Sequence, residues 1–298
     1  GYGRERASTG VLDDLYAKAI VIGDGNTRIA LVTVDSIGLT RPDIVQIETE
    51  LSEQLPSFPA DQLWVASTHT HAGPDVVGLW GKSMWRSGRD PAYMQSLRSR
   101  IVQTIVRANA GRVAVTSRVV SIDLPMDWVV NRSEPGLLDQ RLSVMQFFDA
   151  FGVSVATLTN YACHPTVLDG DNTQVSSDYL AGFYSAMSES VKGEHLFLQG
   201  AIGGWVQPIE GDPSHARAQK LGAQVARAVV GALDESEENP SRPLVMRSKT
   251  FEVPLENWGF KFMMWLGVLE RETFDGAMQT RASWMKIGDA EFVSHPGE

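Results

Sequence analysis

Leu63-Trp-Val-Ala-Ser-Thr-His-Thr-His-Ala-Gly-Pro74 is a short apolar run that leads directly into two histidines. Its first five residues have the length and apolar character of a buried strand, which predicts a strand over residues 63–67. His69 and His71 then follow the carboxyl end of that strand. Because ligand sites in α/β sheets gather at the carboxyl ends of strands, this segment favours an α/β fold with a site beside the two histidines.

Apolar runs on both sides of this segment predict the other strands, and apolar residues at three- and four-residue spacing predict the helices. The predicted strands cover residues 17–22, 29–35, 113–122, 142–149, 154–161, 194–198 and 246–253. The predicted helices cover residues 41–55, 91–110, 178–191 and 214–233, and the polar stretch 234–242 predicts a surface loop. Alternating strands and helices predict an α/β layered domain with mixed β-sheets flanked by helices.

The composition is that of an ordinary globular protein, and it narrows the function. The 298 residues are 43% hydrophobic and 21% charged, which suits one large domain or two small ones. The net charge of −10 argues against a nucleic-acid-binding protein, which needs a basic face to neutralise phosphates. No apolar run approaches the roughly 18 residues of a membrane span. Cys163 is the single cysteine, so any metal must be held mainly by histidine and carboxylate.

Four clusters of polar or glycine-rich residues lie at or just after the ends of predicted strands. They are Asp35-Ser36, Thr68–His71, Cys163-His164-Pro165 and the segment 199–204 (QGAIGG). The last is neither a dinucleotide-binding nor a P-loop pattern, but it permits close backbone approach to a ligand. Four such clusters predict one shared cleft, with a metal site at the strand ends.

His69 and His71 are separated by one residue, and in extended backbone residues i and i+2 point to the same side. Two imidazoles so placed can bind one zinc ion at roughly 2.0–2.1 Å each. The alternative is a pair of hydrogen-bonding histidines at a strand end. His164 strengthens the metal interpretation, since a three-ligand catalytic site requires a third histidine. Its alternative, a satisfied core histidine beside a proline, is the commoner case for a lone histidine.

Three charged residues are further candidates, each with an ordinary alternative. Asp35 could orient a histidine from behind, or it could cap the next turn. Arg132 could bind a carboxylate or stabilise an oxyanion, or it could be a surface arginine. Glu298 could be aimed into the cleft by the Pro-Gly turn before it, or it could be a solvated side chain. Asp178 is a good N-cap for the helix that follows, and it could also face the cleft.

A dense apolar run covers residues 260–266 (FKFMMWL) near the end of the chain. Protein core or a subunit interface is the favoured interpretation. The alternative is an apolar substrate wall or a lip that faces lipid.

Together these motifs resemble the neutral/alkaline non-lysosomal ceramidase family, zinc-dependent amidases that cleave the N-acyl bond of ceramide. The matching segments follow the family's order over almost the full chain: residues 12–35, 68–74 (THTHAGP), 131–133 (NRS), 160–166 (NYACHPT), 176–179 (SSDY), 197–201 (FLQGA) and 296–298 (PGE). The resemblance implies one catalytic domain over residues 1–298, with a zinc ion held by His69, His71, His164 and Glu298. It implies that Arg132 contacts the substrate carbonyl or oxyanion and that Asp35 is an acidic position behind the histidines.

The chain departs from the family in two places. Where ceramidases carry a serine near the zinc, this chain has residues 203–208 (GGWVQP), with Gln207 or Val206 at the serine position. The family also continues past the PGE segment to a tyrosine ligand and often a β-sandwich domain. Either these terminal segments are missing here, or the protein is a minimal, impaired relative.

The hypothesis from sequence is a zinc-dependent, ceramidase-like amidase in sphingolipid metabolism, acting on a small-molecule or lipid-like N-acyl substrate. Metal-activated water would attack a carbonyl polarised by the metal and by Arg132, and this route needs no serine at Gln207. One alternative is a catalytically impaired binding protein on the ceramidase fold, and another is a zinc hydrolase of a non-lipid amide or ester. The resemblance also implies a secreted or periplasmic location.

Overall fold

Strand β3 (Arg28–Val34) is the central strand of the N-terminal half, and all of its residues after Arg28 are buried. Its run of apolar and β-branched residues suits a strand that is covered on both faces. β3 pairs antiparallel with β2 (Ala17–Gly23) and parallel with β4 (Leu63–Ser67). The computed structural model describes residues 3, 5–125, 127–271, 273–274 and 276–297.

Helices α1 (Arg41–Gln54) and α2 (Pro91–Ala110) cover one face of this three-stranded sheet. Thr40 precedes α1, and its hydroxyl donates to the Asp43 carboxylate over 2.8 Å. Asp90 caps α2 by accepting from the Tyr93 amide, and Pro91 supplies a backbone angle suited to a first helical residue. A short 3₁₀ helix (Ala60–Gln62) leads into β4.

A five-stranded sheet forms the second half, in the order β10-β8-β7-β5-β12. Its strands are β5 (Thr116–Asp123), β7 (Arg141–Phe148), β8 (Ser154–Tyr161), β10 (Glu194–Gln199) and β12 (Glu237–Asn239). β10 and β8 are parallel, and the other neighbours are antiparallel. Helices α3 (Tyr179–Ser190) and α4 (His215–Leu233) pack together on its outer face.

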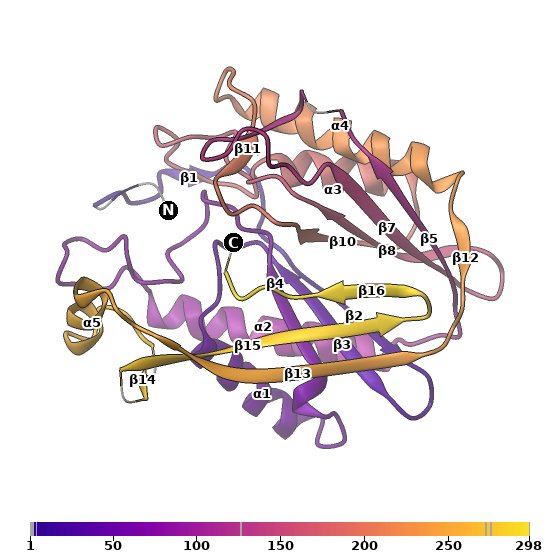
Figure 1. Cartoon of the computed structure of the whole chain (residues 1–298), viewed down its shortest axis with the longest axis horizontal. Coiled ribbons are helices and arrows are strands. Elements are labelled where there is room, and N and C mark those ends of the chain that lie inside the picture. The colour runs from indigo at the N-terminus through magenta and orange to yellow at the C-terminus, as the bar shows by residue number, and fades with distance from the viewer. Residues whose placement is uncertain (1–2, 4, 126, 272, 275, 298) are drawn as a thin grey trace.

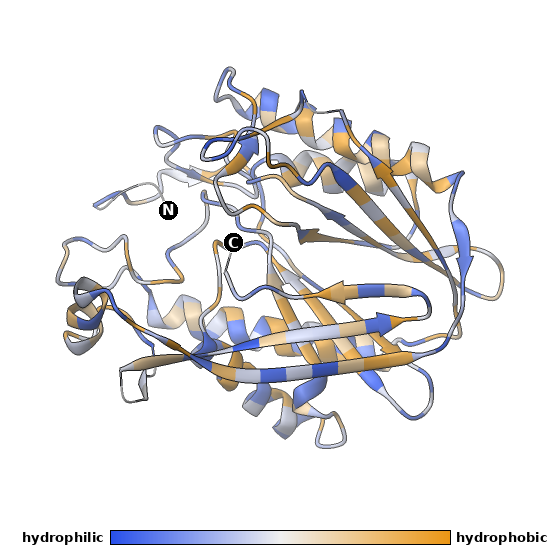
Figure 2. Cartoon of the chain, viewed as in Figure 1, coloured by the Kyte–Doolittle hydropathy of each residue, from blue (hydrophilic) through white to orange (hydrophobic). Residues whose placement is uncertain are grey.

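The molecule is therefore layered in the order helices, sheet, sheet, helices (Figure 1). One core lies between α3/α4 and the five-stranded sheet, and another lies between the three-stranded sheet and α1/α2. The central core joins the facing sheets through side chains such as Leu31, Leu158 and Leu196. Figure 2 shows the hydrophobic residues concentrated on the strands and the inner sides of the helices. Burial of these apolar faces is the main force that holds the layers together.

The remaining elements form a further antiparallel sheet, one short helix and two small strand pairs. β13 (Leu244–Pro254), β14 (Thr273–Phe274), β15 (Ala277–Ile287) and β16 (Ala290–Val293) form an antiparallel sheet, and α5 (Trp258–Trp265) lies between β13 and β14. Two pairs are small: β1 (Gly10–Val11) with β9 (Gln174–Val175), and β6 (Val129–Asn131) with β11 (Val206–Pro208). None of the described helices has the length and apolarity needed to span a membrane.

The prediction of an α/β layered fold with mixed sheets is confirmed, and most predicted elements lie within a few residues of the observed ones. The surface loop predicted over residues 234–242 is wrong, because β12 lies inside it and pairs with β5. Its Asn239 side chain is buried and donates to Ser117 Oγ and to the Ile287 carbonyl. Glu237 and Glu238 stay exposed on this edge strand, so hydropathy gave no sign of it. Core burial of residues 260–266 is also wrong, because no residue of α5 is buried.

Candidate metal centre

Three histidines from two different strand ends meet at one point. His69 and His71 follow β4, and His164 follows β8. One ring nitrogen from each lies within 4.8 Å of the other two, and ring centroids are 4.9–5.7 Å apart. The three can hold a metal ion, as the strand-end positions in the sequence predicted.

The backbone at His69 is not extended, although the argument from sequence assumed an extended backbone through His69 and His71. His69 has φ of 70°, in the left-handed region, so the segment is not extended and the alternation of a strand does not apply. His69 N donates to the Ser36 carbonyl over 2.9 Å, and Thr70 Oγ1 donates to the Ser176 carbonyl over 2.9 Å. These bonds hold the strained residue and the residue after it, and strain of this kind is common where a side chain is positioned for function.

His164 is held by the loop that carries Trp205 and Val206. Its backbone N–H and its ring Nδ1 each lie 2.8 Å from the Val206 carbonyl oxygen, and its side chain is fully buried. A carbonyl accepts only, so Nδ1 carries the proton and Nε2 carries the lone pair that a metal would bind. An imidazole whose other nitrogen donates to a carbonyl is the usual arrangement of a metal-binding histidine. This donor set therefore fits a metal ion.

Gln199, at the end of β10, joins the two histidine-bearing loops. Its Nε2 donates to the Thr68 and Cys163 carbonyls over 3.0 and 2.8 Å, and its Oε1 accepts from Cys163 N over 3.0 Å. Thr68 and Cys163 each precede one of the three histidines. Gln199 thus sets the spacing of the two loops, a role that the sequence did not assign to it.

Asp35 lies at the end of β3, buried, and supports the same segment. Its carboxylate accepts from Thr68 Oγ1 and from the Tyr16 amide, each over 2.9 Å, and the Tyr184 hydroxyl lies 3.5 Å away. Burial raises the pKa of the Asp35 carboxyl to about 6, although these hydrogen bonds lower it. Asp35 therefore positions Thr68, the residue before His69, in keeping with its predicted place behind the histidines.

Trp205 is part of the site and was not predicted from the sequence. Its ring stacks on His164 with centroids 5.0 Å apart and planes at 23°, and it meets His71 edge-on at 5.7 Å. It is partly exposed and has φ of 63°. Trp205 thus forms a wall of the histidine cluster between His164 and solvent-exposed surface.

Two other predicted site residues belong to this region: Arg132 directly follows β6, and Gln207 lies on β11. Arg132 N donates to the Trp205 carbonyl, and the Arg132 guanidinium forms an exposed ion pair with Glu210 over 2.6 Å. Gln207 Oε1 accepts from the Trp205 indole N–H. Both residues are therefore linked to the tryptophan that packs on His164. Glu298 lies outside the described residues.

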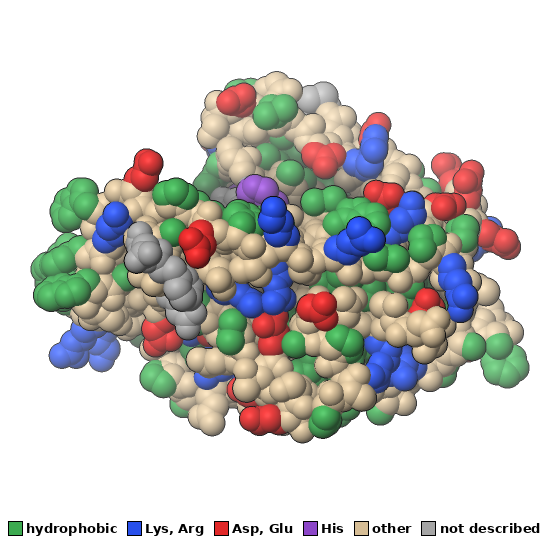
Figure 3. Space-filling view, turned by 60° about the horizontal axis from the view of Figure 1, so that its bottom comes forward, with side chains coloured by type: hydrophobic (Ala, Val, Ile, Leu, Met, Phe, Trp, Pro, Cys, Tyr) green, Lys and Arg blue, Asp and Glu red, His purple; other side chains and the backbone are tan. Residues whose placement is uncertain are grey.

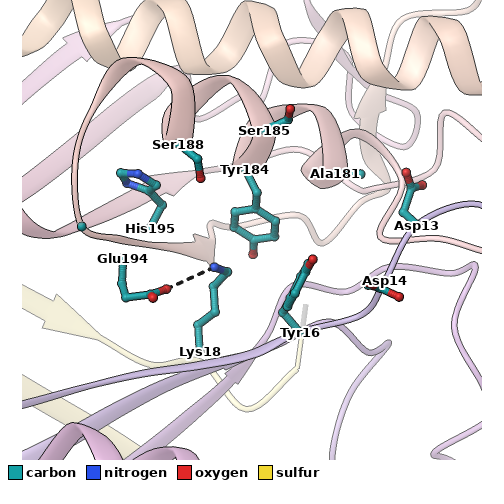
Figure 4. Close-up of a pocket in the computed structure, with 11 residues that line it drawn as sticks. Asp13, Asp14, Tyr16, Lys18, Ala181, Tyr184, Ser185, Ser188, Glu194 and His195 are labelled. Atoms are coloured by element: carbon teal, nitrogen blue, oxygen red, sulfur yellow. Dashed lines mark hydrogen bonds and ion pairs between the residues drawn. The ribbon is translucent and has the colours of Figure 1, made fainter.

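A separate hollow of about 480 Å³ lies beyond Asp35 and contains none of the three histidines (Figure 4). Tyr16 and Tyr184 line it edge-on to each other, and the Lys18 ammonium lies 3.4 Å from Glu194. Ion pairing and cation–π contacts already satisfy its charged lysine. We assign no reacting group to this hollow.

Asp178 caps α3, as predicted, and organises the loop after His164. Its buried carboxylate accepts from the amides of Val167, Leu168 and Tyr179. Its backbone has φ of 59°, which asparagine tolerates better than most residues. Burial raises the pKa of this carboxyl to about 6, although the three amides lower it.

This shift predicts a pH-dependent stability that Asp178→Asn removes. The pKa rises from 3.8 in the unfolded chain to about 6 in the folded protein. The carboxyl's contribution is therefore fully present below pH 4 and is lost as pH rises through 6. The free energy of unfolding of Asp178→Asn minus that of the parent should rise between pH 4 and pH 7 by up to about 3 kcal/mol. Urea unfolding of the metal-free protein at several pH values measures this difference in free energy of unfolding. Asp212→Asn is the control, because Asp212 is exposed, and its difference from the parent should not rise in this way.

Comparison with known proteins agrees with this architecture. Residues 1–224 match the family profile described as neutral/alkaline non-lysosomal ceramidase, N-terminal. The fold is similar to the crystal structure of neutral ceramidase from Pseudomonas aeruginosa, with a TM-score of 0.80 and 18% identity over 98% of this chain and 58% of that chain. A structure described as ceramidase complexed with C2 gives 0.80 and 16%, over 98% of this chain and 59% of that one. This chain thus spans less than two thirds of the length of either. The chain belongs to the neutral/alkaline non-lysosomal ceramidase family.

Proposed function

We propose that the chain is a zinc-dependent hydrolase that cleaves the N-acyl amide bond of a ceramide-like lipid. The observation that carries the proposal is the three-histidine cluster, whose ligand nitrogens lie within 4.8 Å of one another at the strand ends. A set of three imidazoles without cysteine suits a catalytic zinc ion, which needs an open position for substrate. Membership of the ceramidase family supports the choice of an amide bond.

His69, His71 and His164 would hold the ion, with Glu298 as a further ligand by family resemblance. Zinc in such a site supplies a Lewis acid and lowers the pKa of water to about 7. The Val206 carbonyl keeps His164 in the tautomer with its proton on Nδ1. Trp205 shields one side of the cluster from solvent, which strengthens every electrostatic interaction inside it.

Arg132 would bind the carbonyl oxygen of the scissile amide. Its guanidinium offers several N–H donors for the negative charge that develops on that oxygen. The ion pair with Glu210 holds it beside the β6–β11 pair, at the end where Trp205 leads into β11. Gln207 would act by orienting the Trp205 indole, so it is a positioning residue rather than a nucleophile.

The decisive experiment measures metal and turnover together. We expect about one zinc ion per chain and release of fatty acid from N-acylsphingosine in detergent micelles. Activity should disappear with a chelator and return with added zinc. Bound zinc without hydrolysis would favour the non-catalytic alternative. The absence of the family serine from residues 203–208 also favours that alternative. Cleavage of water-soluble N-acyl amides but not of ceramide would favour a non-lipid substrate.

Arg132→Ala should lower kcat/KM by about 100-fold, the usual effect of removing one oxyanion donor. Arg141→Ala is the matched control, because Arg141 is also exposed and its guanidinium lies 3.8 Å from the Asp123 carboxylate. Zinc content should stay unchanged in both variants. Equal activity of Arg132→Ala and Arg141→Ala would contradict a role for Arg132 in catalysis.

A further inference from the structure

Helix α5 displays a group of large apolar side chains on the protein surface. We call Trp85, Trp258, Phe260, Phe262, Trp265 and Leu266 the aromatic patch; all six are exposed, and Trp258 and Trp265 are 79% exposed. Figure 3 shows hydrophobic side chains gathered at the left margin, the side on which Figure 1 places α5. Monomeric proteins seldom leave contiguous aromatic side chains in water without a partner for them.

The patch is held in place. Asn257 caps α5 by accepting from the amides of Gly259 and Phe260. Buried Leu255 precedes the helix, and buried Val268 and Leu269 follow it. The cap and the three buried residues hold both ends of α5 in place while its outer side chains stay exposed. The exposed side chains therefore sit on an ordered helix.

One ring contact joins α5 to the loop after the histidine cluster, and a second lies within α5. Trp85 meets Phe262 edge-on at 6.0 Å, and Phe262 stacks on Trp265 at 5.9 Å. Trp85 belongs to the segment that begins directly after His71, and Asp75 braces the start of that segment by accepting from the amides of Val77, Gly78 and Trp80. The patch is therefore linked along a short, braced stretch of chain to the metal cluster.

The charges beside the patch oppose the charge of the whole protein. Lys82, Arg86 and Lys261 are exposed within or next to its two segments, in a chain of net charge −10. Among the residues that the structure describes on either side of α5, exposed Glu256 precedes the helix, and Glu270 after it lies 3.5 Å from Arg89. Tryptophan prefers the boundary between lipid headgroups and acyl chains, and adjacent cations attract anionic headgroups.

We propose that the aromatic patch is a membrane-docking surface, which places its rings in the headgroup region of a bilayer containing anionic lipid. The biological sense of docking rests on the proposed function, because a ceramide-like substrate lies in a bilayer. The physical binding does not, since it needs neither metal nor turnover. α5 is too short to span a bilayer, so it lies on the surface.

The test is flotation of the 298-residue chain with phosphatidylcholine vesicles, with and without phosphatidylserine. We expect binding that phosphatidylserine strengthens and salt weakens. The double variant Trp258→Ser/Trp265→Ser should lose about tenfold or more in partitioning. Phe151→Ser is the matched control, because Phe151 is 91% exposed in the β7–β8 turn, outside the patch, and its loss should change nothing. Lys82→Glu/Arg86→Glu/Lys261→Glu should abolish the preference for phosphatidylserine.

Two results would overturn the proposal. One is vesicle binding that is absent or equal in the parent and the tryptophan variant. The other is a dimer of the parent that the tryptophan variant converts to a monomer without any vesicle binding, which would make the patch a contact between copies. His164→Ala should bind vesicles like the parent. Failure of hydrolysis with intact docking would therefore disprove only the proposed function.

Discussion

Replacing His164 by alanine is expected to lower zinc affinity by at least about a thousandfold and to abolish hydrolysis. Loss of a partner outside the ligand shell already costs roughly 10- to 100-fold in metal affinity, and a ligand contributes more. His164 is fully buried and lies within reach of both His69 and His71, so no water-exposed side chain can simply replace it. Zinc stoichiometry and a competition titration with a chelator measure the change.

His195→Ala is the matched control for this substitution. His195 is also buried, and its Nε2 lies 3.0 Å from the Val191 carbonyl oxygen, away from the cluster. Both variants remove one buried imidazole, so both should lower stability, but only His164→Ala should lose zinc. Full zinc occupancy in His164→Ala would contradict the site, and zinc loss in both variants would mean that the effect is one of folding.

The positions of the three histidines could be predicted because each follows an apolar run that reads clearly as a strand. β4 matches its predicted limits of 63–67, and β8 those of 154–161. Because ligand sites gather at the carboxyl ends of strands in α/β sheets, the residues that follow β4 and β8, including His71 and His164, are expected to lie close together. The local geometry could not be predicted, because the left-handed backbone of His69 depends on bonds to Ser36, a residue 33 positions away.

Trp205 and Gln199 were missed for a different reason. Their importance lies in what they touch: a ring of a distant histidine in one case, and two carbonyls from separate loops in the other. Nothing in QGAIGGWVQ distinguishes these side chains from ordinary loop residues. The resemblance to ceramidases named the three histidines and Arg132, but the structure was needed to show that Trp205 connects Arg132 to His164.

Gly222→Ala is expected to destabilise the protein by about 3 kcal/mol or more, at the upper end of the cost of overpacking. At this position α4 touches α3 backbone to backbone. A methyl group on Gly222 would overlap the Tyr179 carbonyl oxygen and the Phe183 amide nitrogen. A methyl group on Gly182 of α3 would likewise overlap the backbone of Gln219 on α4. Neither helix can therefore move aside without losing the contact.

Gly231→Ala in the same helix separates this clash from helix propensity. Nothing lies within 4 Å of a Cβ added there, so alanine should stabilise the helix by up to about 1 kcal/mol. Urea unfolding of both variants should therefore give shifts of opposite sign. Equal stabilisation would show that α3 and α4 can separate at no cost.

The contact at Gly222 also reaches the metal centre. Tyr179, which the added methyl would displace, donates its hydroxyl proton to the Cys163 carbonyl over 2.8 Å. Gln199 donates to that same carbonyl, and His164 is the next residue. A Gly222→Ala protein that still folds should therefore bind zinc more weakly than Gly231→Ala, because the helix contact positions the loop that carries His164. Equal zinc affinities would confine the role of the glycine to packing.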